Sequence, residues 1–198
     1  METPGNHWGD PCFRDDPKLA DSPVSSKGKE QIQRLHDNLE DNHKDFLKDV
    51  DLVIVSPLTR TLQTMDGGLQ GLLPEGTRIL AQPLCRERVY TASDCGRLAS
   101  TLEKEYPSVD FSETGPGVWW FDGCGDDEDY QEWRPCDHEQ WYAVQGEPAA
   151  IFYQRMKDFR EWLMARPEQR VVLVGHQAVL LSLTGSKFEN CECRVWKV

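Results

Sequence analysis

Residues 52–64 of this 198-residue chain read LVIVSPLTRTLQT, and this stretch decides the fold class. Its first four residues are all apolar, as in a short strand that is covered on both faces of a sheet. Ser56-Pro57 ends the strand, and the residues from Thr59 to about Gln70 predict a helix. The stretch therefore predicts one strand-then-helix unit of an α/β protein.

The same pattern returns later in the chain. Residues 171–174 read VVLV, the strongest predicted strand, and Gly175-His176 and an apolar helix over 178–183 follow it. Further elements of both kinds are predicted: strands at 78–80 and 193–198, and helices from Ser26 onward and over 148–165. Strands that alternate with helices predict a layered α/β sheet.

Composition narrows the class of partner. The chain has 22 Lys and Arg against 34 Asp and Glu, a net charge of −12, which argues against nucleic acid or an anionic membrane. A small phosphorylated substrate stays compatible with this charge, because a pocket can be locally basic. The sequence holds no apolar run long enough to span a membrane, and its start lacks the features of a signal peptide. We therefore expect a cytoplasmic protein, and its oligomeric state stays open.

The seven cysteines do not predict a metal site. Cys191 and Cys193 form a close pair, and Cys124, Cys136 and His138 are further conceivable ligands. Zinc sites favour two tight pairs of ligands, and this spacing does not provide them. We expect reduced thiols, no metal and no other cofactor.

Residues 88–146 show no clear periodicity. A stretch of this length inside one domain is typical of a functional lid or an inserted subdomain. We therefore expect a single domain over 1–198 with a lid-like insertion at about 88–146. The alternative is a solvated insertion whose tryptophans patch the core. The stretch contains four tryptophans and an acidic run: Trp119, Trp120, Trp133, Trp141 and residues 126–129.

Three residues at predicted strand ends are candidates for chemistry, because open α/β sheets bind ligands there. Arg60 follows strand 52–55 at the start of a helix, where a guanidinium and the helix dipole both favour phosphate. His176 follows strand 171–174 and could donate to an anion. Glu87 follows the weaker strand and could act as a general acid if burial raised its pKa. Each residue alone is more often an ordinary surface or strand-end residue.

Together and in this order, the three segments resemble the histidine phosphatase superfamily, which has the phosphoglycerate mutase-like fold. Residues 56–64, with Ser-Pro-Leu before Arg60, resemble its second arginine motif. Leu84-x-x-Glu87 resembles the segment that carries the acid, and residues 172–176 resemble the strand that ends in its second histidine. The resemblance covers roughly residues 19–198, and flanking segments resemble the branch with eukaryotic phosphoglycerate mutase-like members. It implies three layers, with a mostly parallel sheet between helices on both faces.

The resemblance also implies a function. In this family a phosphoryl group is transferred through a phosphohistidine. By resemblance, Arg60 and His176 bind phosphate, Glu87 and His176 are catalytic, and no metal or cofactor takes part. The substrate would be a small phosphorylated molecule.

The sequence departs from the family at one motif, because it contains no Arg-His-Gly. His7, in Asn6-His7, lacks the supporting strand and following glycine that a nucleophile would need. We therefore expect the first strand and its nucleophile to be missing upstream of Met1, which would leave neighbouring strands with unpaired edges. Two functions stay open: an incomplete or impaired phosphomonoesterase, and a non-catalytic relative that binds a phosphate ligand or a partner. A structural α/β protein with chance motifs is a third alternative.

Overall fold

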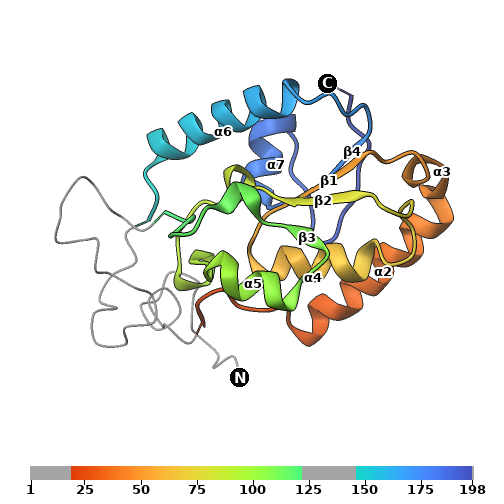
Figure 1. The fold of residues 1–198 in the computed structure, drawn as a ribbon, viewed down its shortest axis with the longest axis horizontal. Coiled ribbons are helices and arrows are strands. Elements are labelled where there is room, and N and C mark those ends of the chain that lie inside the picture. The colour runs from red at the N-terminus through yellow and green to blue at the C-terminus, as the bar shows by residue number, and fades with distance from the viewer. Residues whose placement is uncertain (1–18, 122–145, 198) are drawn as a thin grey trace.

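The computed structural model describes residues 19–121 and 146–197 (Figure 1). Its sheet is parallel throughout and has the order β3-β2-β1-β4. The register places Leu52 between Arg78 and Val171. The strands are β1 (Leu52–Val55), β2 (Arg78–Ala81), β3 (Val109–Asp110) and β4 (Val171–Val174). The parallel α/β fold that the sequence predicts is confirmed.

Helices cover both faces of this sheet, so the fold has three layers (Figure 1). Helices α6 and α7 lie on one face, and α2, α4 and α5 lie on the other. The helices are α2 (Ser26–Asn42), α3 (Lys44–Leu47), α4 (Thr59–Gly68), α5 (Ala99–Glu105), α6 (Ala149–Met164) and α7 (Gln177–Thr184). Short 3₁₀ helices are η2 (Pro83–Cys85), η3 (Ala92–Asp94) and η4 (Ser112–Thr114).

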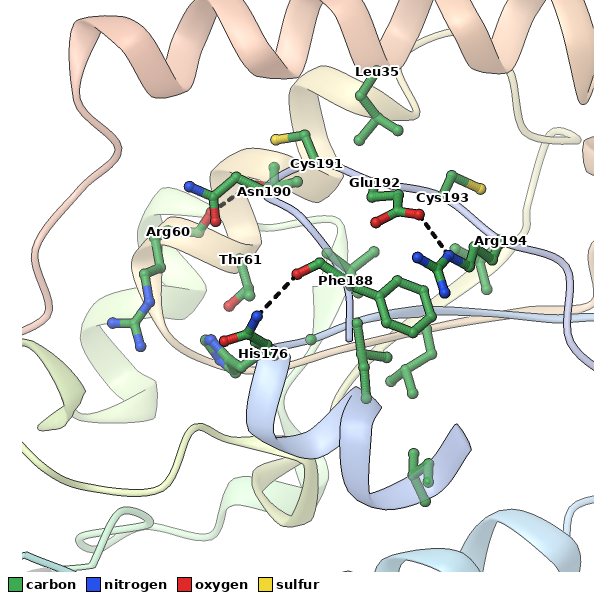
Figure 2. Close-up of a pocket in the computed structure, with 18 of the residues that line it drawn as sticks. Leu35, Arg60, Thr61, His176, Phe188, Asn190, Cys191, Glu192, Cys193 and Arg194 are labelled. Carbon is green, nitrogen blue, oxygen red and sulfur yellow. Dashed lines mark hydrogen bonds and ion pairs between the residues drawn. The ribbon is translucent and has the colours of Figure 1, made fainter. Parts of the chain in front are cut away.

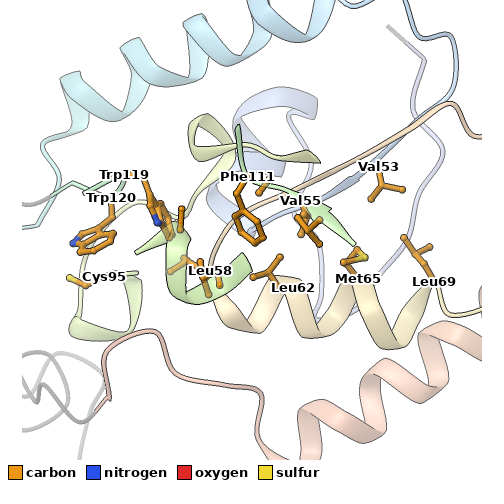
Figure 3. Packing of buried hydrophobic residues seen from close by; sticks show 14 of the residues in the cluster. Val53, Val55, Leu58, Leu62, Met65, Leu69, Cys95, Phe111, Trp119 and Trp120 are labelled. Carbon is orange, nitrogen blue, oxygen red and sulfur yellow. The ribbon is translucent and has the colours of Figure 1, made fainter. Parts of the chain in front are cut away.

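Strand β1 separates two hydrophobic cores. Successive side chains of a strand point to opposite faces, so Val53 and Val55 pack with α4, whereas Leu52 and Ile54 pack with α6 and α7. Figure 3 shows the first of these cores, with Val53 and Val55 above the apolar side of α4. All four β1 side chains are fully buried. Burial on both faces explains why residues 52–55 are uninterruptedly apolar.

The stretch from residue 88 is more regular than the sequence predicts. Its first part contains α5 and β3, and Trp119 and Trp120 are buried in the core beside Cys95 (Figure 3). The two indole rings meet edge to face at 5.4 Å, and Trp119 Nε1 donates to Arg97 O at 2.8 Å. These two tryptophans therefore fill the core. Trp133, Trp141 and the acidic run at 126–129 lie outside the described residues, so the lid-like insertion stays a prediction.

Strand β4 has one free edge among the described strands. It pairs with β1 only, and each of its four apolar residues stays partly exposed. The strand predicted at 193–198 is not formed over its described residues, 193–197. An apolar strand with an open edge is a site at which another strand can pair. The free edge of β4 is therefore a place where the strand expected ahead of Met1 could pair, and that strand stays a prediction.

Among the helices of the described residues, none combines the length and apolar character that crossing a membrane requires.

Candidate functional site

The loops after β1, β2 and β4 meet at one edge of the sheet, because parallel strands end on the same side. They bring Arg60, Glu87 and His176 into the wall of one groove with a volume of about 2500 Å³. The groove continues along the free edge of β4 to the C-terminal segment, residues 187–197. Figure 2 shows Arg60 and His176 on one side of this pocket and the C-terminal segment on the other. The structure thus gathers all three residues that the sequence singles out.

His176 is the most enclosed of the three, at 7% exposed. Its Nε2 lies 2.8 Å from Ser56 Oγ, and its Nδ1 lies 4.0 Å from Glu87 Oε2. Burial lowers the pKa of His176 well below 6.5, and the charges of Arg60 and Arg155 lower it further. The imidazole is therefore neutral near pH 7. A neutral imidazole donates from one nitrogen and accepts at the other.

Ser56 contacts one nitrogen of the imidazole. Its hydroxyl oxygen accepts from Leu58 N–H at 3.4 Å and lies 2.8 Å from His176 Nε2, and in one tautomer of the imidazole the hydroxyl donates to Nε2. Nδ1 then carries the imidazole proton on the side of Glu87. From the sequence, Ser56 is predicted only as part of a motif, without a role of its own. Its position directly after the buried strand is the signal that could have identified it.

Glu87 has the properties of a proton donor. Burial raises its pKa, as does the charge of Asp94, whereas Arg60 and Arg155 act in the opposite direction. Its Oε1 accepts from Arg88 N–H at 2.9 Å. A carboxyl group with a raised pKa can remain protonated closer to neutral pH, which suits general acid catalysis.

Arg60 is held in place by η3. Its Nη1 donates to Ser93 O at 2.6 Å and its Nη2 to Asp94 Oδ1 at 2.9 Å, and its side chain is 26% exposed. Asp94 also accepts from the backbone N–H groups of Tyr90 and Thr91. Asp94 is not among the residues predicted from the sequence, although Thr91-x-x-Asp94 is a capping-box pattern that could have marked it.

The start of α4 does not offer the free anion site that the sequence suggests. The Thr59 N–H donates to Asp21 Oδ1 at 2.7 Å, and Arg97 Nε donates to Asp21 Oδ2 at 2.9 Å. A carboxylate of the chain itself therefore occupies this helix end. Contrary to the expectation from the sequence, the Thr59 N–H at this helix start is therefore not free to bind phosphate.

The described residues contain no group of three or more His, Cys, Asp or Glu that could hold a metal ion. Cys191 and Cys193 are free thiols, and burial raises the pKa of each. Cys124, Cys136, His138 and His7 lie outside the described residues.

Three comparisons show what this chain is similar to. Residues 121–192 match the profile of the histidine phosphatase superfamily (branch 1). A curated relative, a phosphoglycerate mutase-like protein of Arabidopsis thaliana, is 26% identical over 204 residues, which are 86% of this chain. The chain spans 65% of the length of that relative.

Two solved structures match large parts of the chain. The ecdysone phosphate phosphatase of Bombix mori, solved with tungstate, matches with a TM-score of 0.51 at 16% identity over 92% of this chain and 64% of that one. The alpha-ribazole phosphatase of Shigella flexneri matches with a TM-score of 0.44 at 26% identity over 80% of this chain and 63% of that one.

The family profile covers β4 and His176, the curated relative matches most of the chain, and the Bombix mori enzyme shares the parallel α/β fold. The chain is therefore similar to proteins of the histidine phosphatase superfamily.

Proposed function

We propose that this chain provides the phosphate-binding and acid groups of a phosphomonoesterase that acts through a phosphohistidine on a small phosphorylated substrate in the cytoplasm. One observation carries the proposal. A neutral buried imidazole and a carboxyl group of raised pKa meet at 4.0 Å in a groove that Arg60 also lines. The solved relatives are named as phosphatases, which agrees with this chemistry.

Each residue has a defined role in the proposed reaction. Arg60 and the Nδ1–H of His176 donate to oxygens of the phosphoryl group and stabilise the charge that develops on them. A nucleophilic histidine attacks phosphorus while the bond to the leaving oxygen breaks, and Glu87 gives its proton to that oxygen. Water then cleaves the phosphohistidine, and its proton returns to Glu87.

The nucleophile is not among the described residues of this chain. Apart from His176, the described histidines are His36 and His43, on or beside α2, and His36 lies within hydrogen-bonding distance of Gly68 O. We propose that an apolar strand ending in Arg-His-Gly, carried ahead of Met1 in a longer form, supplies it. Such a strand would pair in parallel with the free edge of β4, and its carboxyl end would then lie beside His176.

A second function is a phosphate-binding protein that does not turn over its ligand. Two observations favour it. The 198 residues contain no Arg-His-Gly, and two donors of Arg60 already bond to Asp94 and Ser93. Such a protein would still bind orthophosphate at Arg60 and His176, but would not form a phosphohistidine.

One experiment separates these functions. A longer form that carries the proposed Arg-His-Gly strand, its His176→Ala variant and a His43→Ala control are incubated with an aryl phosphate, and their melting temperatures are measured with and without orthophosphate. Turnover that depends on His176 supports the enzyme and excludes the binding-only protein. Stabilisation by orthophosphate without turnover, lost in His176→Ala alone, supports the second function. If neither effect depends on His176, both proposals are wrong.

A further inference from the structure

A cluster of buried charge lies behind the site, where α6 packs on the loop that carries Glu87. Glu147 has a fully buried side chain, and those of Arg86 and Arg155 are only 7% and 8% exposed. The Glu147 carboxylate accepts from Arg86 Nη1 and Nη2 at 2.8 and 2.9 Å, and from Arg155 Nε and Nη2 at 3.1 and 2.8 Å. Burial alone would raise the pKa of Glu147, but these bonds outweigh burial and lower it, so the carboxylate stays ionised.

Stability alone is a weak explanation for such a cluster. Buried ion pairs often contribute no more to stability than apolar side chains of the same size. Here one carboxylate faces two guanidiniums, so the positive charge is not even balanced. The groups that the other N–H donors of Arg86 and Arg155 bind are therefore informative.

Arg155 binds the backbone on both sides of Glu87. Its Nη1 donates to Leu84 O and to Arg86 O, each at 2.8 Å, and its Nη2 lies 3.5 Å from Glu87 O. Arg86 Nη1 also donates to Glu87 O, at 3.1 Å. The two planar guanidiniums thus bind the consecutive carbonyl groups of Arg86 and Glu87. These residues lie in a loop that forms no helix or strand between η2 and η3.

The backbone of Glu147 closes the same loop from the other side. Its carbonyl oxygen accepts from Arg88 Nε at 2.8 Å, and its N–H donates to Val89 O at 2.8 Å. Glu147 therefore contacts the loop that carries Glu87 both before and after that residue. It also joins that loop to α6 through Arg155.

We propose that Glu147 and Arg155 are positioning residues, which hold the Glu87 carboxyl group at its place beside His176. The importance of this place for catalysis rests on the proposed function. The positioning itself does not, because it concerns only the relative placement of two side chains of this chain. The fork of Arg155 is the decisive feature, since a lysine would keep the charge beside Glu147 but could not reach both carbonyl groups and the carboxylate.

The test uses His176 as a reporter. Long-range ¹H–¹⁵N spectra of the histidine imidazoles are recorded for the full chain and for Glu87→Gln, Arg155→Lys and Arg160→Lys, with His176→Ala to assign the signals. Glu87→Gln shows how the His176 signals move when the carboxyl group is lost. Arg160 is exposed on the same helix, so Arg160→Lys is the matched control.

We expect Arg155→Lys to move the His176 signals in the same direction as Glu87→Gln, and Arg160→Lys to leave them in place. A general loss of stability would not move signals of the native state. A folded Arg155→Lys variant whose His176 signals coincide with those of the unaltered chain would overturn the proposal.

A second measurement needs no variant, in case Arg155→Lys does not fold. The amide of Glu147 should exchange its hydrogen as slowly as the amides of α6, because it donates to Val89 in the loop. Exchange at the rate of an exposed loop amide would overturn the proposal. Orthophosphate is added last to the unaltered chain: if the His176 signals do not respond, the proposed function fails, while the effect of Arg155→Lys still decides the positioning.

Discussion

The hydrogen bond between Ser56 and His176 gives the sharpest stability prediction. Both residues are buried, Ser56 completely, and the Oγ to Nε2 distance is 2.8 Å. Ser56→Ala removes the donor and leaves a buried imidazole nitrogen without it, which costs about 1–3 kcal/mol. In a chain that already carries His176→Ala, the same change leaves no orphaned nitrogen. The two substitutions should therefore couple, by about 1 kcal/mol.

The assay is a double-mutant cycle by urea denaturation near pH 7, where His176 is neutral. The free energy of unfolding is measured for the chain, both single variants and the double variant. Ser100→Ala, at an exposed serine of α5, should change stability by less than about 0.5 kcal/mol. If the effects of Ser56→Ala and His176→Ala add within about 0.5 kcal/mol, the hydrogen bond does not hold the imidazole, and the tautomer argued from it is wrong.

Three further predictions follow from packing, titration and the free edge. A Cβ on Gly96 would lie 2.2 Å from Trp119 Cζ2, so Gly96→Ala should lower the free energy of unfolding by about 1–3 kcal/mol in urea. Gly117→Ala, at a glycine with open space around it, should leave that free energy unchanged, and equal effects of the two substitutions would refute the prediction. The lowered pKa of His176 means that the unfolded chain binds more protons below pH 6.5, so stability should fall as pH drops through that value; His176→Asn should weaken this dependence, and an unchanged slope would count against it. A longer form with an apolar strand ahead of Met1 should melt at a higher temperature and aggregate less than the 198-residue chain; a cooperative, high-temperature melt of the shorter chain would contradict the missing strand.

Local patterns were sufficient to predict the central strands and the long helices. Residues 52–55 and 171–174 are apolar without interruption because β1 is covered on both faces and β4 lies next to it. The predicted helix over 148–165 corresponds to α6, since its apolar residues recur at the spacing of one helix face. The polar residues that follow the apolar runs mark the carboxyl ends of two strands. The positions of Arg60 and His176 near these ends could therefore be predicted from the sequence.

Short elements escaped prediction for a physical reason. Strand β3 has two residues, too few for any alternation to show, and α5 buries only Ala99 and Leu102. Strand β3 pairs with β2, and buried residues of β3 and α5 belong to the same core as Trp119 and Trp120, contacts that a local window does not contain.

The supporting residues of the site escaped because their partners are distant in the chain. Asp21 reaches Thr59 across 38 residues, Asp94 reaches Arg60 across 34, and Glu147 reaches Arg86 across 61. A sequence shows that an acidic residue is present, but the charge it will meet depends on the assembled fold.

Orthophosphate binding tests the central claim most directly. Isothermal titration is performed with the unaltered chain, with Arg60→Ala, and with Arg78→Ala as a control whose exposed side chain bonds to Asp110 away from the groove. A charged hydrogen bond contributes about 1.5–3 kcal/mol, so Arg60→Ala should weaken binding by about tenfold or more, and Arg78→Ala should leave it unchanged. Equal affinities of the chain and Arg60→Ala for orthophosphate would contradict the claim that Arg60 and His176 form a phosphate site.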